Sequence, residues 1–282
     1  MTRHILLTGA SGFVGRALLE AFAQHDVSIT IVGRHALPEF ADYDTIRKVI
    51  TVDSLFTLSV DAWRDWLSDV DCVLHAAWYV DPKDYLHAAE NLQCLQGSLN
   101  LVQACRAANV AAFCGIGTCF EYDHAEPALR VSTPLKPQSV YAASKSALCS
   151  VAQQLLKETS TAFSWYRLFY LYGKHEKPGR FVSYLRDQFQ RGQPAVVNNP
   201  TLQRDYMDVA DAADKIVASV LRGGQGVFNV CSEQPISLGA LAKRIAAEHH
   251  AEHLLTLTTP LGGAPSVPVL YGISNLETDR HD

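Results

Sequence analysis

Near its start the chain has a short apolar run that leads into three regularly spaced glycines, Ile5-Leu6-Leu7-Thr8-Gly9-Ala10-Ser11-Gly12-Phe13-Val14-Gly15. The apolar run predicts a strand and the residues after it predict a helix, so the glycines occupy a tight turn between the two. Glycine in that turn allows a sharp bend, close approach of a pyrophosphate and close packing of the helix on the strand, while the helix N-terminus attracts the anion. The predicted cofactor-binding residues of this turn are Gly9, Ser11, Gly12, Phe13, Val14 and Gly15.

A second pattern, Tyr141-Ala142-Ala143-Ser144-Lys145, places a phenol and an ammonium four residues apart, which makes them neighbours on one helical face. A free phenol titrates near ~10, so it exchanges protons at neutral pH only with help. A nearby ammonium favours the phenolate and lowers the pKa of the phenol. Together with the glycine turn, this pair indicates a nicotinamide-dependent enzyme in which Tyr141 is the general acid.

The bulk composition is that of a globular protein with a sizeable core: 282 residues, 48% hydrophobic and 19% charged. A net charge of −5 argues against a nucleic-acid partner, and no apolar stretch is long enough for a membrane span. The first strand begins so early that we expect no signal peptide. The cysteines and histidines show no metal-ligand spacing, so we expect reduced thiols, a cytoplasmic protein and no metal site.

The pattern along the chain predicts an α/β fold in two parts. Residues 1–170 alternate short apolar runs with segments of helical periodicity, which is typical of a doubly wound parallel sheet covered on both faces. The predicted strands are 3–8, 28–33, 47–52, 71–75, 111–117 and 162–168, and the predicted helices are 13–25, 59–69, 84–108 and 138–158. Ligands bind such sheets at the carboxyl ends of the strands.

Residues 171–282 are expected to form most of a smaller substrate-binding region, with some strands returning to the main sheet. Helical periodicity marks 178–192, 208–222 and 237–249, and short extended pieces lie at 195–197, 203–206 and 226–230. The stretch beyond about residue 255 carries no pattern that assigns it.

The end of the second predicted strand, Val32-Gly33-Arg34-His35, bears on the choice of cofactor. A site that prefers NAD places an acidic residue there to accept bonds from the ribose 2′-hydroxyl. Here Gly33 leaves space, and Arg34 offers a planar fork suited to a phosphate. The sequence therefore favours NADP(H), with NAD(H) left open; in the rival interpretation Arg34 is a surface residue that stacks on adenine.

Several ordered motifs give the chain a resemblance to the extended short-chain dehydrogenase/reductase family, in its NAD-dependent epimerase/dehydratase branch that modifies nucleotide sugars. The resemblance covers roughly residues 3–245. The motifs are TGASGFVG at 8–15, HAA at 75–77, Asn91 followed by Gly97, GIGTCFEY at 115–122, Pro134 and Pro137 before YAASK at 141–145, RLFYLYG at 167–173, RDYMDVAD at 204–211 and GVFNVCSEQPISL at 226–238.

The resemblance implies a Rossmann sheet with a substrate-capping α/β region, and it implies roles for individual residues. Thr118 would hold the substrate oxygen, and Lys145 would also bind the nicotinamide ribose. Asp53 would contact adenine, although capping of the following helix explains it nearly as well. Further cofactor contacts would come from His75, Ala76, Ala77, Phe169 and Tyr170. Contacts to a nucleotide-diphosphate sugar would come from Tyr79, Cys119, Phe120, Arg180 and Arg204, with Tyr122 as another candidate for the sugar.

The same resemblance bears on the reaction. In dehydratases of this branch an acidic pair follows the Thr, whereas Cys119 and Phe120 follow Thr118 here, so elimination is excluded. This leaves an NADPH-dependent reductase of a nucleotide-diphosphate 4-keto-6-deoxy sugar as the preferred function, with an NAD-dependent nucleotide-sugar 4-epimerase as the alternative. A non-catalytic NADP-sensing regulator is a third candidate, against which the intact Thr118, Tyr141 and Lys145 argue.

Two further expectations come from the family. An acid–base pair like that of GDP-fucose synthase would need a Cys and a His, but the family's Cys falls at Phe120 and its His beyond His175. Family members commonly form homodimers through the helices that correspond to 84–108 and 138–158.

Overall fold

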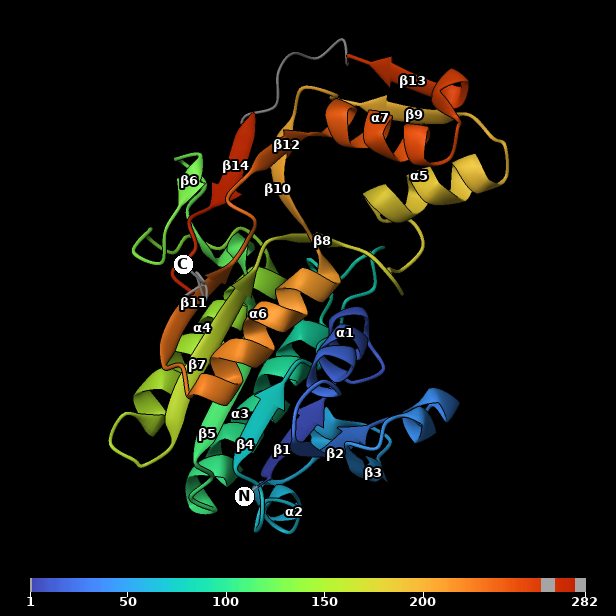
Figure 1. Ribbon diagram of the computed structural model, residues 1–282. Coiled ribbons are helices and arrows are strands. Elements are labelled where there is room, and N and C mark those ends of the chain that lie inside the picture. The colour runs from blue at the N-terminus through green and yellow to red at the C-terminus, as the bar shows by residue number, and fades with distance from the viewer. Residues whose placement is uncertain (1, 260–266, 277–282) are drawn as a thin grey trace, which may run out of the picture.

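A computed structural model describes residues 2–259 and 267–276 of the chain. Its centre is a parallel sheet of seven strands in the order β11-β7-β5-β4-β1-β2-β3 (Figure 1). The chain leaves β1 first toward β2 and β3 and then returns to the other side of β1 as β4, so the strand order reverses between β1 and β4. These strands are β1 (Arg3–Thr8), β2 (Val27–Gly33), β3 (Ile46–Thr51), β4 (Cys72–His75), β5 (Ala112–Thr118), β7 (Ala162–Leu168) and β11 (Gly226–Val230). The predicted doubly wound α/β fold is confirmed.

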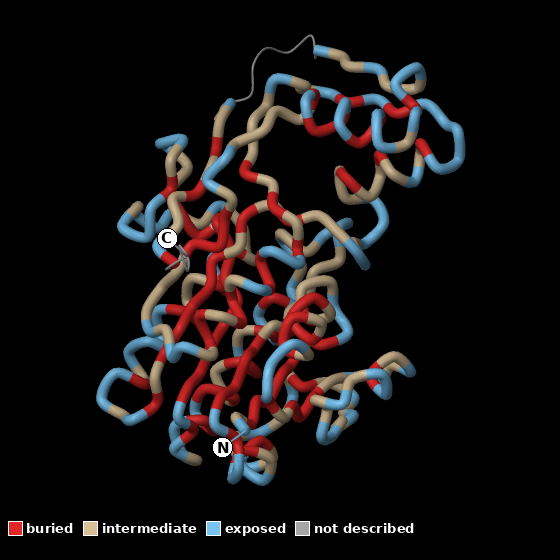
Figure 2. Tube along the Cα trace, viewed as in Figure 1, coloured by how far each residue is buried: buried red, intermediate tan, exposed pale blue. Residues whose placement is uncertain are grey.

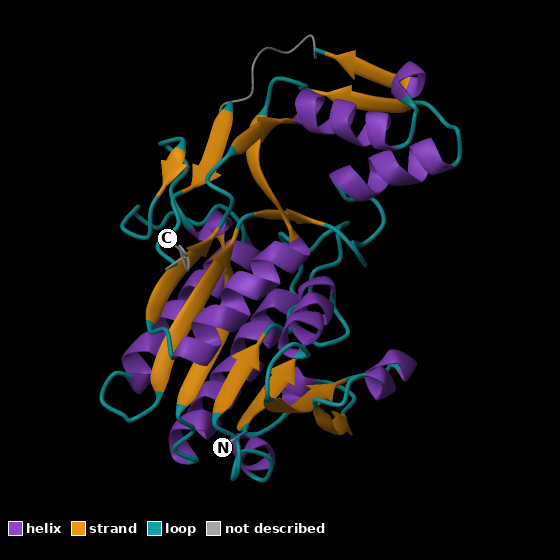
Figure 3. Ribbon diagram, in the orientation of Figure 1, coloured by secondary structure: helices purple, strands orange, loops and turns teal. Residues whose placement is uncertain are grey.

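Helices cover both faces of the sheet (Figure 3). On one face α1 (Phe13–Phe22) and α6 (Val209–Arg222) pack on the side chains of Ile5 and Leu7. On the other face Leu6 packs with α2 (Val60–Arg64), α3 (Glu90–Ala107) and α4 (Val140–Leu156). Because neighbouring residues of a strand point to opposite faces, a strand covered on both sides has an uninterrupted apolar run, such as Ile5-Leu6-Leu7 in β1.

The buried residues follow this arrangement, running along the strands of the central sheet and the helix faces against it (Figure 2). No helix in the described part of the chain is both long enough and apolar enough to cross a membrane.

A second, smaller group of elements lies beyond the carboxyl ends of the strands (Figure 1). The helices α5 (Phe181–Gln190) and α7 (Leu238–Glu248) pack on the strand pair β9 (Ala195–Asn198) and β13 (Leu255–Thr258) around a core of their own. The strand β10 (Gln203–Asp208) connects this group to the rest of the molecule. It pairs with β8 (Tyr170–Tyr172), β12 (Pro235–Ser237) and β14 (Val269–Gly272), and β14 pairs with β6 (Ala128–Leu129).

The extended piece predicted at 226–230 is β11, which pairs in parallel with β7 at the edge of the main sheet. The stretch beyond residue 255, which the sequence left unassigned, contains β13 and β14. Residues 260–266 and 277–282 of this region lie outside the described residues.

Two predicted helices are shorter than expected. The periodic segment 84–108 becomes helical only at Glu90, because residues 81–89 form successive turns in which the carboxylate of Asp81 accepts from the N–H of Lys83. The segment 59–69 is helical only to Arg64, beyond which the N–H of Leu67 bonds the carbonyl of Arg64 in a turn. The first difference matters for function, since residues 76–89 become a loop beside the carboxyl ends of the strands.

Candidate functional site

A cavity of about 670 Å³ lies at the carboxyl ends of the central strands, between the sheet and the second group of elements. This is the edge where the strand order reverses, the usual ligand site of such sheets. Of the residues singled out from the sequence, it is lined by Gly9, Ser11, Gly12, Phe13, Val14, Gly15, Arg34, Asp53, Ala76, Ala77, Tyr79, Thr118, Cys119, Phe120, Tyr141, Lys145, Phe169, Tyr170 and Arg180.

The glycine turn forms one wall. Gly9 has a φ of +77°, which side chains other than glycine rarely adopt, and a Cβ there would lie 2.6 Å from the backbone nitrogen of Ala77. Gly12 is the N-cap of α1 and carries no side chain to cap its first N–H groups. A cradle of glycine backbone at a helix N-terminus fits the pyrophosphate of a dinucleotide.

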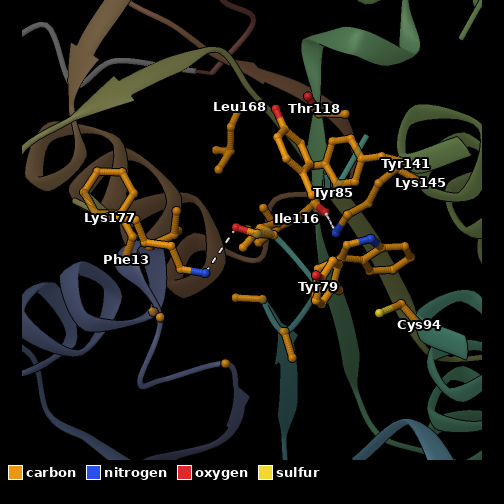
Figure 4. A pocket seen from close by; sticks show the side chains of 18 of the residues that line it. Phe13, Tyr79, Tyr85, Cys94, Ile116, Thr118, Tyr141, Lys145, Leu168 and Lys177 are labelled. Carbon is orange, nitrogen blue, oxygen red and sulfur yellow. Dashed lines mark hydrogen bonds between the residues drawn. The ribbon is translucent and has the colours of Figure 1, made fainter. Parts of the chain in front are cut away.

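Tyr141 and Lys145 lie one turn apart on α4, whose N-terminus is capped by the hydroxyl of Ser139. The ring of Tyr141 packs edge-on against Tyr85, with 5.1 Å between the ring centroids. The Nζ of Lys145 donates to the carbonyl of Ile116 at 2.7 Å and lies 3.9 Å from the ring centroid of Trp78 (Figure 4). A carbonyl and a cation–π contact therefore fix the ammonium of Lys145, one helical turn along α4 from Tyr141.

Burial shifts the pKa values of these groups in opposite directions. It lowers the pKa of Lys145 to about 7 and raises that of Tyr141 above its usual value, which is the opposite of the lowering that the sequence predicted for Tyr141. It also raises the pKa of the Cys119 thiol well above its usual value, so this group stays protonated at neutral pH and is a poor acid–base partner.

Thr118 ends β5 at the floor of the cavity. Its Oγ1 accepts from the N–H of Phe120 at 3.3 Å, at the start of the short helix η3 (Cys119–Glu121). A hydroxyl has one proton to donate besides its acceptor lone pairs. In this contact it acts as the acceptor, so the hydroxyl proton is available for an oxygen in the cavity.

His75 does not line the cavity. Its ring is buried behind β4, where Nδ1 lies 2.8 Å from the hydroxyl of Thr8 and Nε2 lies 2.8 Å from that of Ser98. Burial first, and then the charge of Lys145, lower the pKa of His75 to about 3, so the ring is neutral. The position at the strand end is as predicted, but the side chain supports the sheet instead of facing the cavity.

Arg204 and Tyr122 also lie outside the cavity lining. The Nη1 of Arg204 donates to the carbonyls of Gln203 and Val267, and its guanidinium lies 5.9 Å from the ring centroid of Tyr170. The hydroxyl of the buried Tyr122 donates to Asn229.

Several lining residues were missed by the sequence interpretation. Trp78 and Tyr85 come from the loop 76–89, which periodicity had assigned partly to a helix, and Glu176, Lys177 and Tyr206 come from the second group of elements. The position of Trp78 directly after the HAA motif at a strand end was a signal for it. The Nζ of Lys177 donates to the carbonyl of Val80 at 3.1 Å and so bridges the cavity between two loops (Figure 4).

Glu176 is an unusual member of this lining because its Oε2 is buried without a hydrogen-bond partner among the described residues. Burial raises its pKa to about 7, although the nearby charges of Arg180 and Arg186 act in the lowering direction. The folded protein therefore holds a proton here at pH values where the unfolded chain, with the usual value of 4.5, has lost it.

The sign of this shift predicts a pH-dependent stability. The stabilisation that the folded protein gains from protonated Glu176 is fully present below the pKa of the unfolded chain. It is lost as the pH rises through the pKa of Glu176 in the folded protein. Glu176→Gln is neutral at every pH, so we expect its Tm relative to the natural protein to be higher at about pH 8 than at about pH 5. Glu158→Gln, a change at an exposed carboxylate, is the control. Equal Tm differences at the two pH values for Glu176→Gln would contradict the buried, protonated state.

Comparison with known proteins places this geometry in a family. The family described as NAD dependent epimerase/dehydratase matches residues 5–231. The chain is 29% identical to a GDP-6-deoxy-D-mannose reductase of Pseudomonas aeruginosa over 264 residues, 87% of this chain and 80% of that protein. It is 23% identical to a dTDP-6-deoxy-L-talose 4-dehydrogenase (NAD(+)) of Aggregatibacter actinomycetemcomitans over 256 residues, 88% of this chain and 91% of that protein.

Among solved structures, the fold is similar to that of the UDP-glucose 4-epimerase of Thermus thermophilus in complex with NAD. The TM-score is 0.80 at 18% identity, with 96% of this chain and 90% of that chain covered. The family match spans the glycine turn, Thr118 and the Tyr141–Lys145 pair. The chain therefore belongs to the NAD-dependent epimerase/dehydratase family and is an NAD(P)-dependent enzyme of the extended short-chain dehydrogenase/reductase type.

Proposed function

We propose that this enzyme is an NADPH-dependent reductase of a nucleotide-diphosphate 4-keto-6-deoxy sugar. The observation that carries the proposal is the convergence of Thr118, Tyr141 and Lys145 on a cavity whose far end is lined by Gly33 and Arg34. The two curated relatives, a reductase and a 4-dehydrogenase of 6-deoxy sugars by name, support this reaction class.

Reduction of a ketone to an alcohol adds a hydride to the carbon and a proton to the oxygen. When bound, the nicotinamide cofactor supplies the hydride. The proton comes from the hydroxyl of Tyr141, and the ammonium of Lys145 stabilises the phenolate that is left. The hydroxyl of Thr118 donates a hydrogen bond to the keto oxygen and polarises the carbonyl. Arg180, which also lines the cavity, would hold the diphosphate of the substrate.

The test is to incubate the purified protein with NADPH and a panel of 4-keto and 4-hydroxy nucleotide sugars while following NADPH absorbance. A reductase exchanges its cofactor in each cycle, so it should purify largely empty and consume NADPH in proportion to the keto sugar. The alternative function is an NAD-dependent 4-epimerase, the activity named for the NAD-bound structural neighbour. An epimerase restores its own cofactor in each cycle. Protein that arrives loaded with NAD and interconverts 4-hydroxy sugars without NADPH would overturn the proposal.

Arg34 carries the proposed preference for NADP(H). It is exposed at the end of β2 and lines the cavity, at the position where an NAD-preferring site would place an acidic residue. The carboxylate of Asp53, which follows the neighbouring strand β3, also lines the cavity. A charge-assisted hydrogen bond is worth about 1.5–3 kcal/mol, which corresponds to about 10–150-fold in affinity. We therefore expect Arg34→Ala to weaken NADPH binding by about this factor and to leave NADH binding nearly unchanged.

Titration of both cofactors against both proteins by calorimetry measures this difference. Equal losses for NADPH and NADH would show that Arg34 contacts the adenine that the two cofactors share, as in the rival interpretation.

We also propose that two copies of the chain pair through α3 and α4. Each helix carries an exposed apolar side chain, Leu92 on α3 with 60% of its surface exposed and Val151 on α4 with 47%. Pairing of these helices would bury both side chains. Analytical ultracentrifugation of the protein and of Val151→Glu tests this pairing, since a monomer in both samples would contradict it.

A further inference from the structure

Beneath the cavity lies a buried ion pair that the proposed reaction does not use. The carboxylate of Glu121, with 0% of the residue exposed, accepts from the Nε of Arg167 at 2.8 Å, and Arg167 is itself 3% exposed. Neither side chain lines the cavity. An apolar pair of similar size in such a place is often as stable as the ion pair, so stability alone explains the charges poorly.

The first consequence of this pair is geometric. The Oε1 of Glu121 accepts from the backbone N–H of Thr118 at 2.9 Å and from the Nε1 of Trp165 at 3.0 Å. A Cβ on Gly117 would lie 2.5 Å from the same carboxylate oxygen, so glycine there permits the close approach. The residue that would hold the substrate oxygen is therefore fixed from below by Glu121.

The hydrogen-bond network of Glu121 and Arg167 continues away from the cavity, and these further bonds hold the Glu121 carboxylate in place. The Nη1 of Arg167 donates to the hydroxyl of Tyr122 at 3.0 Å, and this hydroxyl donates to Oδ1 of Asn229 at 2.7 Å. The side-chain amide of Asn229 in turn donates to the carbonyls of Leu129 and Ile273. Both carboxylate oxygens of Glu121 are thus tied into a network that extends well beyond β5.

The second consequence is electrostatic and concerns Lys145, which is 2% exposed. The Nζ of Lys145 lies 5.9 Å from the ring centroid of Trp165, whose indole N–H bonds Glu121. Burial disfavours the ammonium, and Glu121 is the largest influence that favours it, followed by Cys94. Five other groups around the ammonium are neutral in charge: the rings of Trp78 and Trp165, the Ile116 carbonyl, the Tyr141 phenol and the buried His75 ring. The cation of the network, Arg167, bonds Oε2 of Glu121, whereas the indole of Trp165 bonds Oε1.

We propose that Glu121 is a positioning residue of this enzyme: its carboxylate fixes the backbone of Thr118 and supplies the buried negative charge that holds Lys145 as an ammonium. The proposal rests on the proposed function for what Thr118 and Lys145 do with the substrate. The state of Lys145 itself, however, is measurable without any substrate.

The experiment is an NMR titration of protein labelled with ¹³C at the lysine ε-carbons, with the Lys145 signal identified as the one missing in Lys145→Arg. In the natural protein we expect this signal to titrate far below the other lysines. Glu121→Gln keeps an oxygen acceptor for Thr118 but loses the charge, so we expect the pKa of Lys145 to fall by about half a unit or more. An unchanged Lys145 titration in Glu121→Gln would overturn the proposal.

Two further variants separate charge from folding. Asp205→Asn alters another fully buried carboxylate, which accepts from the N–H groups of Ser232, Glu233 and Gly272, and should lower Tm without moving the Lys145 signal. If Glu121→Gln fails to fold, the double variant Glu121→Leu/Arg167→Met removes both charges together, which buried pairs tolerate better than loss of one partner. It should move the Lys145 signal in the same direction as Glu121→Gln but less far, because loss of the Arg167 cation acts in the opposite direction. A signal at or above its original pH would overturn the proposal.

A kinetic experiment becomes possible once the panel of nucleotide sugars has identified a substrate that the enzyme turns over. In Glu121→Gln the loss of activity at alkaline pH should begin at lower pH than in the natural enzyme, because removal of the negative charge eases deprotonation of both Lys145 and Tyr141. Glu121→Asp keeps the charge but shortens the reach to Thr118, so it should lower kcat with the pH profile in place. A panel without turnover contradicts the proposed function and leaves the NMR titration as the deciding test of Glu121.

Discussion

Tyr141→Phe is expected to lose most turnover while it keeps the fold and cofactor binding. The substitution removes one hydroxyl, and the ring keeps its edge-on contacts with Tyr85 and Trp78. Loss of a positioned proton donor lowers turnover by about 10²–10⁴-fold. Steady-state kinetics with NADPH and the keto sugar that the panel identifies measures this loss, and calorimetric titration of NADPH checks that cofactor binding is retained.

Tyr166→Phe is the matched control. Tyr166 is buried on β7, where its hydroxyl donates to the hydroxyl of Ser219 at 3.0 Å. Removal of this hydroxyl should leave turnover within about threefold, because proton donation is not involved. Turnover of Tyr141→Phe in the same narrow range as Tyr166→Phe would refute the assignment of Tyr141 as the general acid.

The elements of the central sheet were predictable because their sequences are governed by burial. The central parts of β1, β4 and β5 are continuous runs without charged residues (5–7, 72–74 and 112–117), as expected of strands covered on both sides. The second group of elements was harder to predict. β6 has two residues and β12 has three, and strands this short carry no periodicity that distinguishes them from turns.

Residues of the site were predictable where the backbone itself makes the site. The glycine turn and the four-residue spacing of Tyr141 and Lys145 depend on local geometry, which a sequence specifies. His75 and Arg204 depend on where a side chain points. The His75 ring is hydrogen-bonded to the two buried hydroxyls of Thr8 and Ser98, and the Arg204 guanidinium donates to two backbone carbonyls.

Glu121 shows a further limit of prediction from sequence alone. Its partners Thr118 and Trp165 come from β5 and β7, neighbouring strands that η3, β6 and α4 separate in sequence. Only the register of the sheet, in which Gly117 lies opposite Arg167, brings a Glu after one strand to an Arg within the next. The sequence of one chain gives no signal of that pairing.

Gly15→Ala is expected to lower both stability and cofactor affinity, although alanine is the better helix former. Gly15 lies within α1, where alanine gains about 1 kcal/mol in helix propensity. Against this, a Cβ at Gly15 would lie 2.0 Å from the carbonyl oxygen of Gly9 and 2.8 Å from the Cα of Ala10. These are backbone atoms that cannot rotate away, so the turn and the helix must move apart. Overpacking typically costs about 1–3 kcal/mol, and contacts this short belong at its upper end.

The clash therefore outweighs the gain in propensity, and a net loss of about 2 kcal/mol lowers Tm by about 4–8 °C in a protein of this size. The same displacement separates the N–H groups of the turn from the pyrophosphate, so NADPH affinity should fall by about tenfold or more, equivalent to at least about 1.4 kcal/mol. Gly33→Ala is the control for Tm, because a Cβ there meets nothing within 4 Å. Calorimetry and thermal melts measure both effects. If Gly15→Ala had the same Tm as Gly33→Ala and bound NADPH as tightly as the natural protein, the glycine turn could not be the closely packed cradle of the cofactor.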